Sequence, residues 1–326
     1  MDFEMQYTKE QENFRTEVRA WLNEHAKVPA ELGEIPHENW PITREMWEWG
    51  VNFRGKLGEK GWLFPLWDAD YGGGGLTPEQ NIVIAEELEK VEVPRIYSNN
   101  FAMPALFVYG TEEQKQRLLR PLLTGESICW QGFTEPEGGS DLASLKTRAT
   151  KDGDDFIISG QKMWIGDQYD ADYIWTPAVT DPDAPRHQNL GAFMIPWDAE
   201  GITIHDLNLM VGHRKRLISF DQVRVSSSDL IGGETQGWRV ISASLEIEHG
   251  AGGGVRGEDS FLNDTIQYTK DTTRNGQPLS KDPFVQSLMV DNMIESNVLR
   301  LIELRNYSMF NNAEVVTYHG SQGSFM

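Results

Sequence analysis

Cysteine and basic residues are the two scarce classes in this 326-residue sequence. The single cysteine, Cys129, excludes an intrachain disulfide and a cysteine-bound metal cluster, and we interpret it as a small buried apolar residue. Lys and Arg total 29 against 50 Asp and Glu, which gives a formal net charge of -21. A field this negative repels nucleic acid and anionic lipid, so neither is expected as a partner. Since one cysteine cannot form a metal-binding cluster, no metal site is expected either.

Long apolar runs are also missing. No stretch reaches the roughly 20 apolar residues of a membrane-spanning helix, and the N-terminus lacks the basic and then apolar pattern of a signal peptide. We therefore expect a cytoplasmic chain without a membrane span. The hydrophobic content of 39% still supplies a sizeable core, and the length predicts about two to three structural units.

The first part of the chain has a helical pattern. Three threonines are each followed three positions later by glutamine, which is typical of an N-terminal capping box: Thr8–Gln11, Thr77–Gln80 and Thr111–Gln114. Apolar residues follow at helical spacing. We predict a helical domain over residues 1–127.

From about Cys129 the pattern changes to short β-rich runs. The stretch TRATKDGDDFIISGQKMWI contains Asp-Gly and Ser-Gly dipeptides, which we predict to be hairpin turns. Further strands are expected at residues 173–175, 192–195, 202–204 and 217–220. Their spacing predicts a small antiparallel barrel or sandwich over residues 128–236.

After Gly237 the helical pattern returns. One segment runs from Trp238 towards Lys270, with an interruption at GAGGG, and Asp282-Pro283 caps a final strong helix. We predict a C-terminal helical domain over residues 237–326, incomplete because the chain ends without a terminal helix. The expected fold class is α+β: a helical domain, a central antiparallel β domain and a helical bundle.

Four motifs in order resemble the acyl-CoA dehydrogenase family. GFTEPEGGSD (Gly132–Asp141) resembles the family's Thr-Glu-Pro and Gly-Ser-Asp signature at the flavin edge, and SGQKMWIG (Ser159–Gly166) resembles its second stretch. GTEEQKQRLLRPLLTGE (residues 110–126) and RNGQPL (residues 274–279) fall in the family's order. The resemblance covers nearly the whole chain. It implies the family's fold and its activity, the FAD-dependent α,β-desaturation of an acyl-CoA thioester.

The resemblance also implies the site residues. Flavin-binding positions match Gln131, Phe133, Thr134, Trp164 and Gly166, and an acyl-CoA contact matches Ser140. Backbone and hydroxyl donors along the flavin's pyrimidine edge would stabilise the negative charge of the reduced ring. Alternatively, Thr134 and Ser140 only cap turns, and Trp164 is a core aromatic residue.

A carboxylate base is needed near the α-carbon of the thioester, while the hydride from the β-carbon goes to flavin N5. The resemblance implies one of two positions for this base, and the late one lies beyond the end of this sequence. The early one falls in LEIEHG and assigns Glu248 as the base, since Glu246, two residues away, points elsewhere on a helix. A solvated surface glutamate is the alternative.

Three departures from the family's pattern leave other interpretations open. Gly166 stands where a Ser or Thr usually donates towards flavin N5, Arg274 is displaced by two from the arginine that binds the FAD pyrophosphate, and the glycine-rich adenosine segment would lie beyond Met326. In the first interpretation, the chain is an acyl-CoA dehydrogenase that is cut short. In the second, it is a half-site partner subunit, which has lost part of the FAD site, in a heterotetramer that acts on steroid-like acyl-CoAs. A flavin monooxygenase on the same fold is a third interpretation, which Glu248 disfavours.

Several partners follow from these interpretations. They are an acyl-CoA substrate, further copies of the chain in a dimer of dimers or a second acyl-CoA dehydrogenase subunit, and an electron-transfer flavoprotein or similar acceptor. Apolar faces on the last helices motivate the oligomer. The basic run GHRKRL (residues 212–217) is either a lip that steers the CoA phosphates or a solvated loop.

Overall fold

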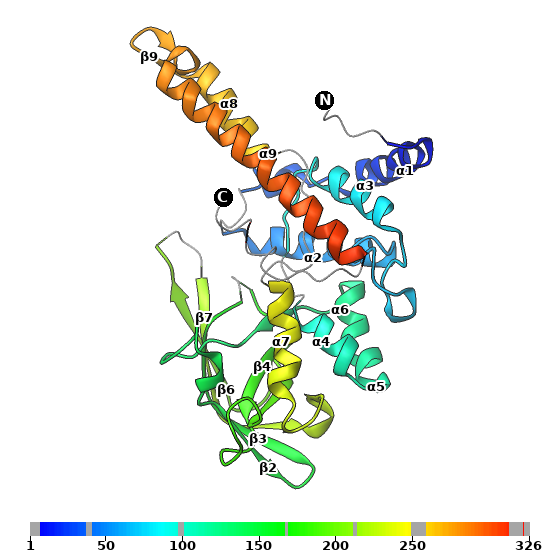
Figure 1. Cartoon of the computed structure of the whole chain (residues 1–326), viewed down its shortest axis with the longest axis vertical. Helices are drawn as coiled ribbons and strands as arrows, with labels where there is room; N and C mark the ends of the chain where they lie inside the picture. Colours follow the sequence, from blue (N-terminus) through cyan, green and yellow to red (C-terminus); the bar gives the residue numbers. More distant parts are fainter. Residues whose placement is uncertain are drawn as a thin grey trace. The chain divides into compact units, whose positions relative to one another are not determined.

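The chain divides into two compact units (Figure 1). The computed structural model describes residues 7–36, 41–96, 101–166, 169–210, 214–248, 259–312 and 322. The first unit comprises residues 1–22, 78–91 and 246–326, and the second comprises residues 23–77 and 92–245. Within the described ranges, every helix is too short or too polar to cross a membrane. The cytoplasmic location stays a prediction.

The second unit is built on one sheet in which most neighbouring strands are antiparallel. Its strands are β1 (Cys129–Gln131), β2 (Arg148–Asp152), β3 (Asp155–Ile165), β4 (Tyr173–Val179), β5 (Leu190–Pro196), β6 (Ile202–Asn208), β7 (Arg214–Ser226) and β8 (Leu230–Ile231). They lie in the order β6-β7-β3-β2-β4-β5-β8, and β1 pairs in parallel with β4. Each of the four further strands expected from the sequence lies inside one of these elements.

Of the two predicted kinds of turn, the Asp-Gly turn is confirmed and the Ser-Gly turn is wrong. Gly153 has φ +64° in the turn between β2 and β3. Ser159 and Gly160 instead lie inside β3, which continues to Ile165. A Cβ atom on Gly160 would lie only 2.6 Å from the Thr147 hydroxyl oxygen. The glycine therefore permits a close approach of two chain segments rather than a reversal.

Several helices of the second unit pack with this sheet. They are α2 (Arg44–Glu59), α4 (Ala102–Tyr109), α5 (Glu112–Gln114), the π-helical turn η3 (Lys115–Leu119), α6 (Arg120–Thr124) and α7 (Gly237–Glu248), whose last three residues count to the first unit. Short 3₁₀ turns are η1 (Ala30–Leu32), η2 (Ala69–Tyr71), η4 (Leu142–Ser144) and η5 (Ser227–Asp229). The predicted capping box of Thr111 and Gln114 is confirmed. Pro121 lacks an N–H, which explains why regular α-helical bonding is interrupted just before it.

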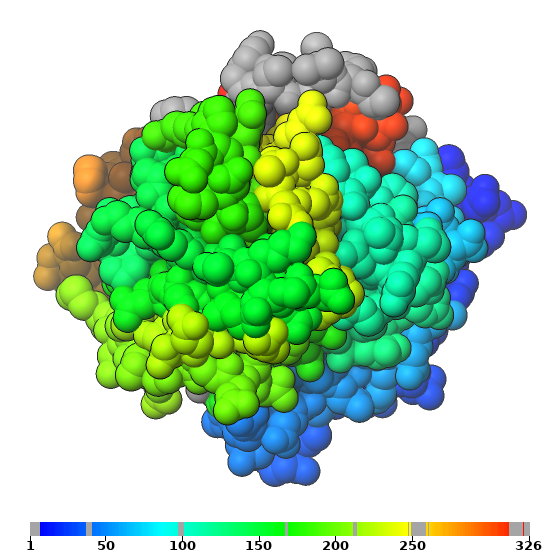
Figure 2. Space-filling model, turned by 90° about the horizontal axis from the view of Figure 1, so that it is seen from below, coloured from blue at the N-terminus to red at the C-terminus, as the bar shows by residue number. Residues whose placement is uncertain are grey.

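Two apolar cores hold the second unit together. One lies between the helices and the outward faces of β4, β5 and β8, and joins Leu106, Leu118 and Leu122 to Trp175 and Met194. The other lies inside the curved sheet and includes Phe156, Ile158, Phe193, Ile218 and Val223. Figure 2 shows α7 (yellow) along the border between the strands (green) and α4–α6 (teal). The sheet therefore contributes residues to both cores.

The first unit is helical. It contains α1 (Lys9–His25, its last three residues counting to the second unit), α3 (Pro78–Leu88), α8 (Ser260–Asp271), β9 (Thr273–Arg274), β10 (Gln277–Pro278), η6 (Leu279–Lys281) and α9 (Pro283–Asn311). The capping box at Thr8 and Gln11 is confirmed by bonds of 2.8 and 3.2 Å, and Asp282 caps α9 as predicted. The order of helices, strands and helices confirms the expected α+β class. The division at residues 127 and 236 stays a prediction.

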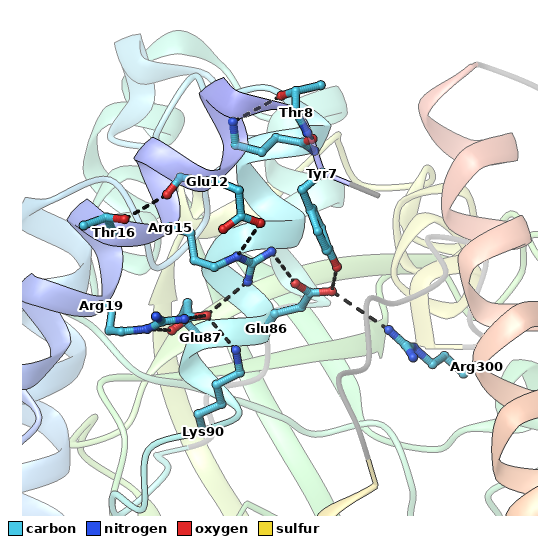
Figure 3. Close-up of polar contacts among 11 residues, drawn as sticks. Tyr7, Thr8, Glu12, Arg15, Thr16, Arg19, Glu86, Glu87, Lys90 and Arg300 are labelled. Carbon is cyan, nitrogen blue, oxygen red and sulfur yellow. Dashed lines mark hydrogen bonds and ion pairs between the residues drawn. The ribbon is translucent and has the colours of Figure 1, made fainter. Parts of the chain in front are cut away.

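Two adjacent glutamates of α3 join three helices of the first unit (Figure 3). The guanidinium of Arg15 on α1 lies 2.8 Å from Glu86 and 3.0 Å from Glu87. Glu87 also accepts from Arg19 and Lys90, and Glu86 lies 3.9 Å from Arg300 on α9. Because both glutamates are nearly buried, this network fixes α1 and α9 on opposite sides of α3 by charge as well as by apolar packing.

Candidate functional site

The loop that carries the Thr-Glu-Pro stretch begins where β1 ends. The Gly132 N–H donates to the Trp175 carbonyl at 2.8 Å, and the Thr176 hydroxyl donates to the Gly132 carbonyl. A Cβ on Gly132 would lie 2.6 Å from that hydroxyl oxygen, so only glycine fits here. The first residue of the loop is thereby fixed against β4.

A tight turn closes the middle of the loop. Glu135 and Gly138 exchange backbone hydrogen bonds of 2.8 and 3.1 Å across Pro136 and Glu137. Beyond the turn, Ser140 is exposed and Asp141 forms an ion pair with Arg186 of the β4–β5 connection. The loop is thus a compact, hydrogen-bonded structure rather than an open segment.

The end of β3 meets this loop at a β-bulge. Lys162 pairs with Ile218 and Ile165 with Arg216, so β3 has one residue more than β7 between these pairs. The bulge gives Trp164 a φ of 63° and leaves its side chain 51% exposed. The Met163 N–H donates to the Thr134 carbonyl at 2.9 Å, which joins the strand directly to the loop.

The five flavin positions expected from the sequence therefore gather in one place. We call residues 131–134 and 163–166 the β1–β3 site. Phe133 is buried, Gln131 and Thr134 are half-buried, and Trp164 is exposed. Within the described ranges, the hydroxyls of Thr134 and Ser140 make no hydrogen bond.

Gly166 closes the β1–β3 site with its backbone alone. Its φ is +64°, and a Cβ on it would lie 2.9 Å from ring atoms of Trp130. The Lys215 ammonium donates to its carbonyl at 2.6 Å. The indole of Trp130 thus occupies the space that the Ser or Thr side chain expected from the family would need.

A buried ion pair beneath the loop was not predicted from the sequence. The Lys162 side chain has no solvent exposure, and its Nζ lies 2.8 Å from Glu135 Oε1. Burial lowers the pKa of Lys162 to about 8, although Glu135 opposes this shift. Burial would raise the pKa of Glu135, but Lys162 and the hydrogen bonds from Thr147 and Lys146 lower it overall. Lys162 shares the strand parity of Phe156 and Ile158, and this signal in the sequence places it inward.

Glu248 lies elsewhere in the chain. It is the last residue of α7, it is exposed, and it belongs to the first unit, whereas the β1–β3 site belongs to the second. Arg274 also belongs to the first unit, where it is exposed in the β9–β10 hairpin around Asn275 and Gly276. The candidate base and the β1–β3 site therefore belong to different units.

The described residues of the basic run make contacts within the second unit. Arg214 and Arg216 pair with Asp206 at 3.3 and 3.1 Å, and Lys215 is bound to the Gly166 carbonyl. Residues 212 and 213 lie outside the described ranges. Most of the described part is thus committed to contacts within the sheet.

The β1–β3 site suits a flat ring with hydrogen-bond acceptors along one edge. It combines an exposed indole, a half-buried hydroxyl and backbone groups of a loop that is fixed before any ligand arrives. A preorganised set of donors next to an aromatic surface is the kind of site that binds and tunes a flavin. The residues of the β1–β3 site fit a flavin ring. Gly166, which has no side chain, can contribute only its backbone groups.

Comparison with known proteins identifies the class. The family model "Acyl-CoA dehydrogenase, N-terminal domain" matches residues 8–126, and "Acyl-CoA dehydrogenase, middle domain" matches residues 131–223. Acyl-CoA dehydrogenase FadE26 of Mycobacterium tuberculosis is 30% identical over 309 residues, which cover 91% of this chain and 74% of FadE26. The chain belongs to the acyl-CoA dehydrogenase family and is an oxidoreductase of that class.

Solved structures agree in fold. An acyl-CoA dehydrogenase from Geobacillus kaustophilus is 29% identical with a TM-score of 0.76, covering 97% of this chain and 83% of that one. The steroid acyl-CoA dehydrogenase Tcur3481-Tcur3483 is 28% identical with a TM-score of 0.77, covering 99% and 81%. The expected family fold is therefore confirmed over nearly the whole chain.

Proposed function

We propose that the chain binds FAD at the β1–β3 site and takes part in the α,β-desaturation of an acyl-CoA thioester. The observation that carries this proposal is the hydrogen bond between Met163 N–H and the Thr134 carbonyl. It brings the Thr-Glu-Pro loop and the Trp-Ile stretch into one site, although they are about 30 residues apart in the sequence. Family membership supports the same chemistry.

Each residue of the site has a proposed role. The Thr134 hydroxyl and the backbone near Gln131 and Phe133 hold the edge of the ring, and Trp164 covers it. Ser140, exposed at the end of the loop, contacts the acyl-CoA. A bound FAD would supply the acceptor for the hydride of the β-carbon. The donors of the loop stabilise the charge that this transfer brings.

Glu248 is the proposed base for the α-proton. The reaction needs one carboxylate at the α-carbon, and α7 ends with this residue. The natural oxidant is proposed to be an electron-transfer flavoprotein or a similar acceptor. The cytoplasm is the proposed location.

A half-site partner subunit is the second candidate function. The specific observation that favours it is the Trp130 ring, which excludes a hydroxyl side chain at position 166. A structural relative named for two proteins, Tcur3481-Tcur3483, also supports a heteromer and a steroid-like acyl group. In this case a second acyl-CoA dehydrogenase subunit completes the site.

The absorbance spectrum of the purified chain tests both functions. A flavin spectrum in the chain alone supports the dehydrogenase, and bleaching by an acyl-CoA under anaerobic conditions identifies the substrate. A flavin spectrum that forms only after a second dehydrogenase subunit is added supports the half-site subunit. Absence of flavin under both conditions would reject FAD as the cofactor.

A further inference from the structure

Lys162 and Glu135 form a buried charged pair that the proposed reaction does not use. The ammonium lies 2.8 Å from Glu135 Oε1 and 3.3 Å from the Phe133 carbonyl oxygen. The carboxylate of Glu135 also accepts from the N–H groups of Lys146 and Thr147 at 2.7 and 3.0 Å. The pair therefore joins the loop, β3 and the residues just before β2.

Stability alone does not account for this pair. Burying two charges carries a large desolvation cost, and apolar residues of similar volume are often neutral or stabilising replacements. Both side chains are nearly or fully buried, with exposures of 0% for Lys162 and 8% for Glu135. The pair is better explained by the backbone group that it orients, the peptide between Phe133 and Thr134.

The peptide between Phe133 and Thr134 is what the lysine orients. Its carbonyl faces the buried ammonium, and in a trans peptide the N–H points the opposite way. The Thr134 N–H therefore points away from the lysine. It donates to no acceptor in the part of the chain that the structure describes.

We propose that Lys162 and Glu135 are positioning residues that fix and polarise the Phe133–Thr134 peptide so that its N–H is presented to the flavin ring. A cation on the carbonyl side of a peptide strengthens the N–H on its other side as a donor. A stronger donor favours the reduced, more negative flavin over the oxidised one. The inference rests on the proposed function, because it needs FAD at the β1–β3 site.

The decisive variant removes both charges together. Lys162→Met or Glu135→Gln alone leaves one buried charge unpaired and is expected to destabilise the fold strongly. The double variant Glu135→Gln/Lys162→Met keeps the volume and leaves no such charge, so it is expected to fold. Asp229→Asn is the matched control. Asp229 is a nearly buried carboxylate of η5 in the same unit, and the variant removes the charge that pairs with Arg117 at 2.8 Å.

Three measurements follow. The dissociation constant for FAD is expected to rise at least tenfold in the double variant. The two-electron potential of bound FAD is expected to fall by about 30 mV, a tenfold change in relative affinity for the two redox forms. In the protein without FAD, hydrogen exchange is expected to be faster at the amides of Met163, Lys146 and Thr147. Asp229→Asn should change none of the three.

The outcomes separate this inference from the proposed function. A double variant that binds FAD with the affinity and potential of the unmodified protein overturns the inference and leaves the proposed function intact. An unmodified protein that binds no FAD, alone or with a second subunit, overturns the proposed function and the flavin role of the pair with it. Unchanged hydrogen exchange in the double variant would show that the pair does not hold the loop.

Discussion

The indole of Trp130 fills the space beside Gly166. A Cβ atom on Gly166 would lie 2.9 Å from the ring, which is closer than real Cβ contacts allow. Trp130 is itself 5% exposed and donates from Nε1 to the Tyr169 carbonyl at 3.2 Å, so its ring cannot easily move aside. The glycine at the end of β3 is therefore a requirement of packing as well as of its backbone angle.

Gly166→Ala is expected to destabilise the fold by about 2–4 kcal/mol, since the left-handed φ costs about 1 kcal/mol and overpacking adds about 1–3. The measurement is urea unfolding. Gly153→Ala is the matched control, because Gly153 has the same φ of +64° with nothing within 4 Å of its Cβ position. Gly153→Ala should lower the free energy of unfolding only by the cost of the left-handed φ. Equal losses in the two variants would show that Trp130 exerts no steric effect.

Trp164→Gly is expected to leave a more stable protein than Trp164→Ala, by about 1 kcal/mol. Trp164 has φ 63°, which glycine adopts freely and alanine does not. The side chain is 51% exposed, so both variants lose similar packing. Thermal unfolding without FAD measures the difference. Both variants should bind FAD more weakly than the unmodified protein, and unchanged affinity would remove Trp164 from the flavin site.

Acid should weaken the contacts of Glu87 in the first unit. Burial would raise the pKa of Glu87, but hydrogen bonds from Arg19, Lys90 and Arg15 outweigh it and lower the value to about 2. The folded state thus holds the charged form more strongly than the unfolded state, whose glutamate pKa is about 4.3. This stabilisation is present above pH 4.3 and is lost as the pH falls towards 2.

Glu87→Gln should make the free energy of unfolding less dependent on pH in that window. We expect a difference of about 1–2 kcal/mol, because the exposed partners Arg19 and Lys90 are screened by solvent. Unfolding by urea at pH 2.5 to 6 measures it. Glu12→Gln serves as the control, since Glu12 is 53% exposed and 3.7 Å from Arg15. A pH dependence as steep as in the unmodified protein would contradict the role of Glu87.

Glu248→Gln should slow flavin reduction by substrate by on the order of a hundredfold or more, the usual scale for loss of a general base. The amide keeps the size of the side chain but not its basicity, so FAD and acyl-CoA affinity should change little. Anaerobic stopped-flow bleaching of the flavin measures the rate. Glu246→Gln, two residues earlier on α7, is the control. An unchanged rate in Glu248→Gln would transfer the role of base to a partner subunit.

The chain is expected to form oligomers, a dimer of dimers being the proposed state. Large apolar side chains of α9 are exposed at helical spacing: Phe284, Leu288, Ile294, Val298 and Leu301, with exposures of 38–71%. Contact between copies would remove this surface from water. Sedimentation at micromolar concentration should show a species larger than the monomer, and Ile294→Glu/Val298→Glu should dissociate it. A monomeric unmodified chain would contradict the prediction.

Local sequence determined much of this protein. Capping residues such as Thr8, Thr111 and Asp282 begin helices where their side chains bind the first free N–H groups, which is a short-range effect readable from the chain. Short β-rich runs likewise indicated the strands from local composition. The Thr-Glu-Pro and Trp-Ile stretches identified the candidate flavin loop through their resemblance to the family.

Contacts between distant segments decided the rest. Ser159-Gly160 has the composition of a turn, but the closeness of Thr147 makes the glycine a strand residue. Lys162 and Glu135 are 27 positions apart, and only the register of β3 against the loop buries them together. Trp130 and Gly166 likewise meet only in the folded sheet. Such pairings depend on which segments pack side by side, and that is a property of the whole fold rather than of any single stretch.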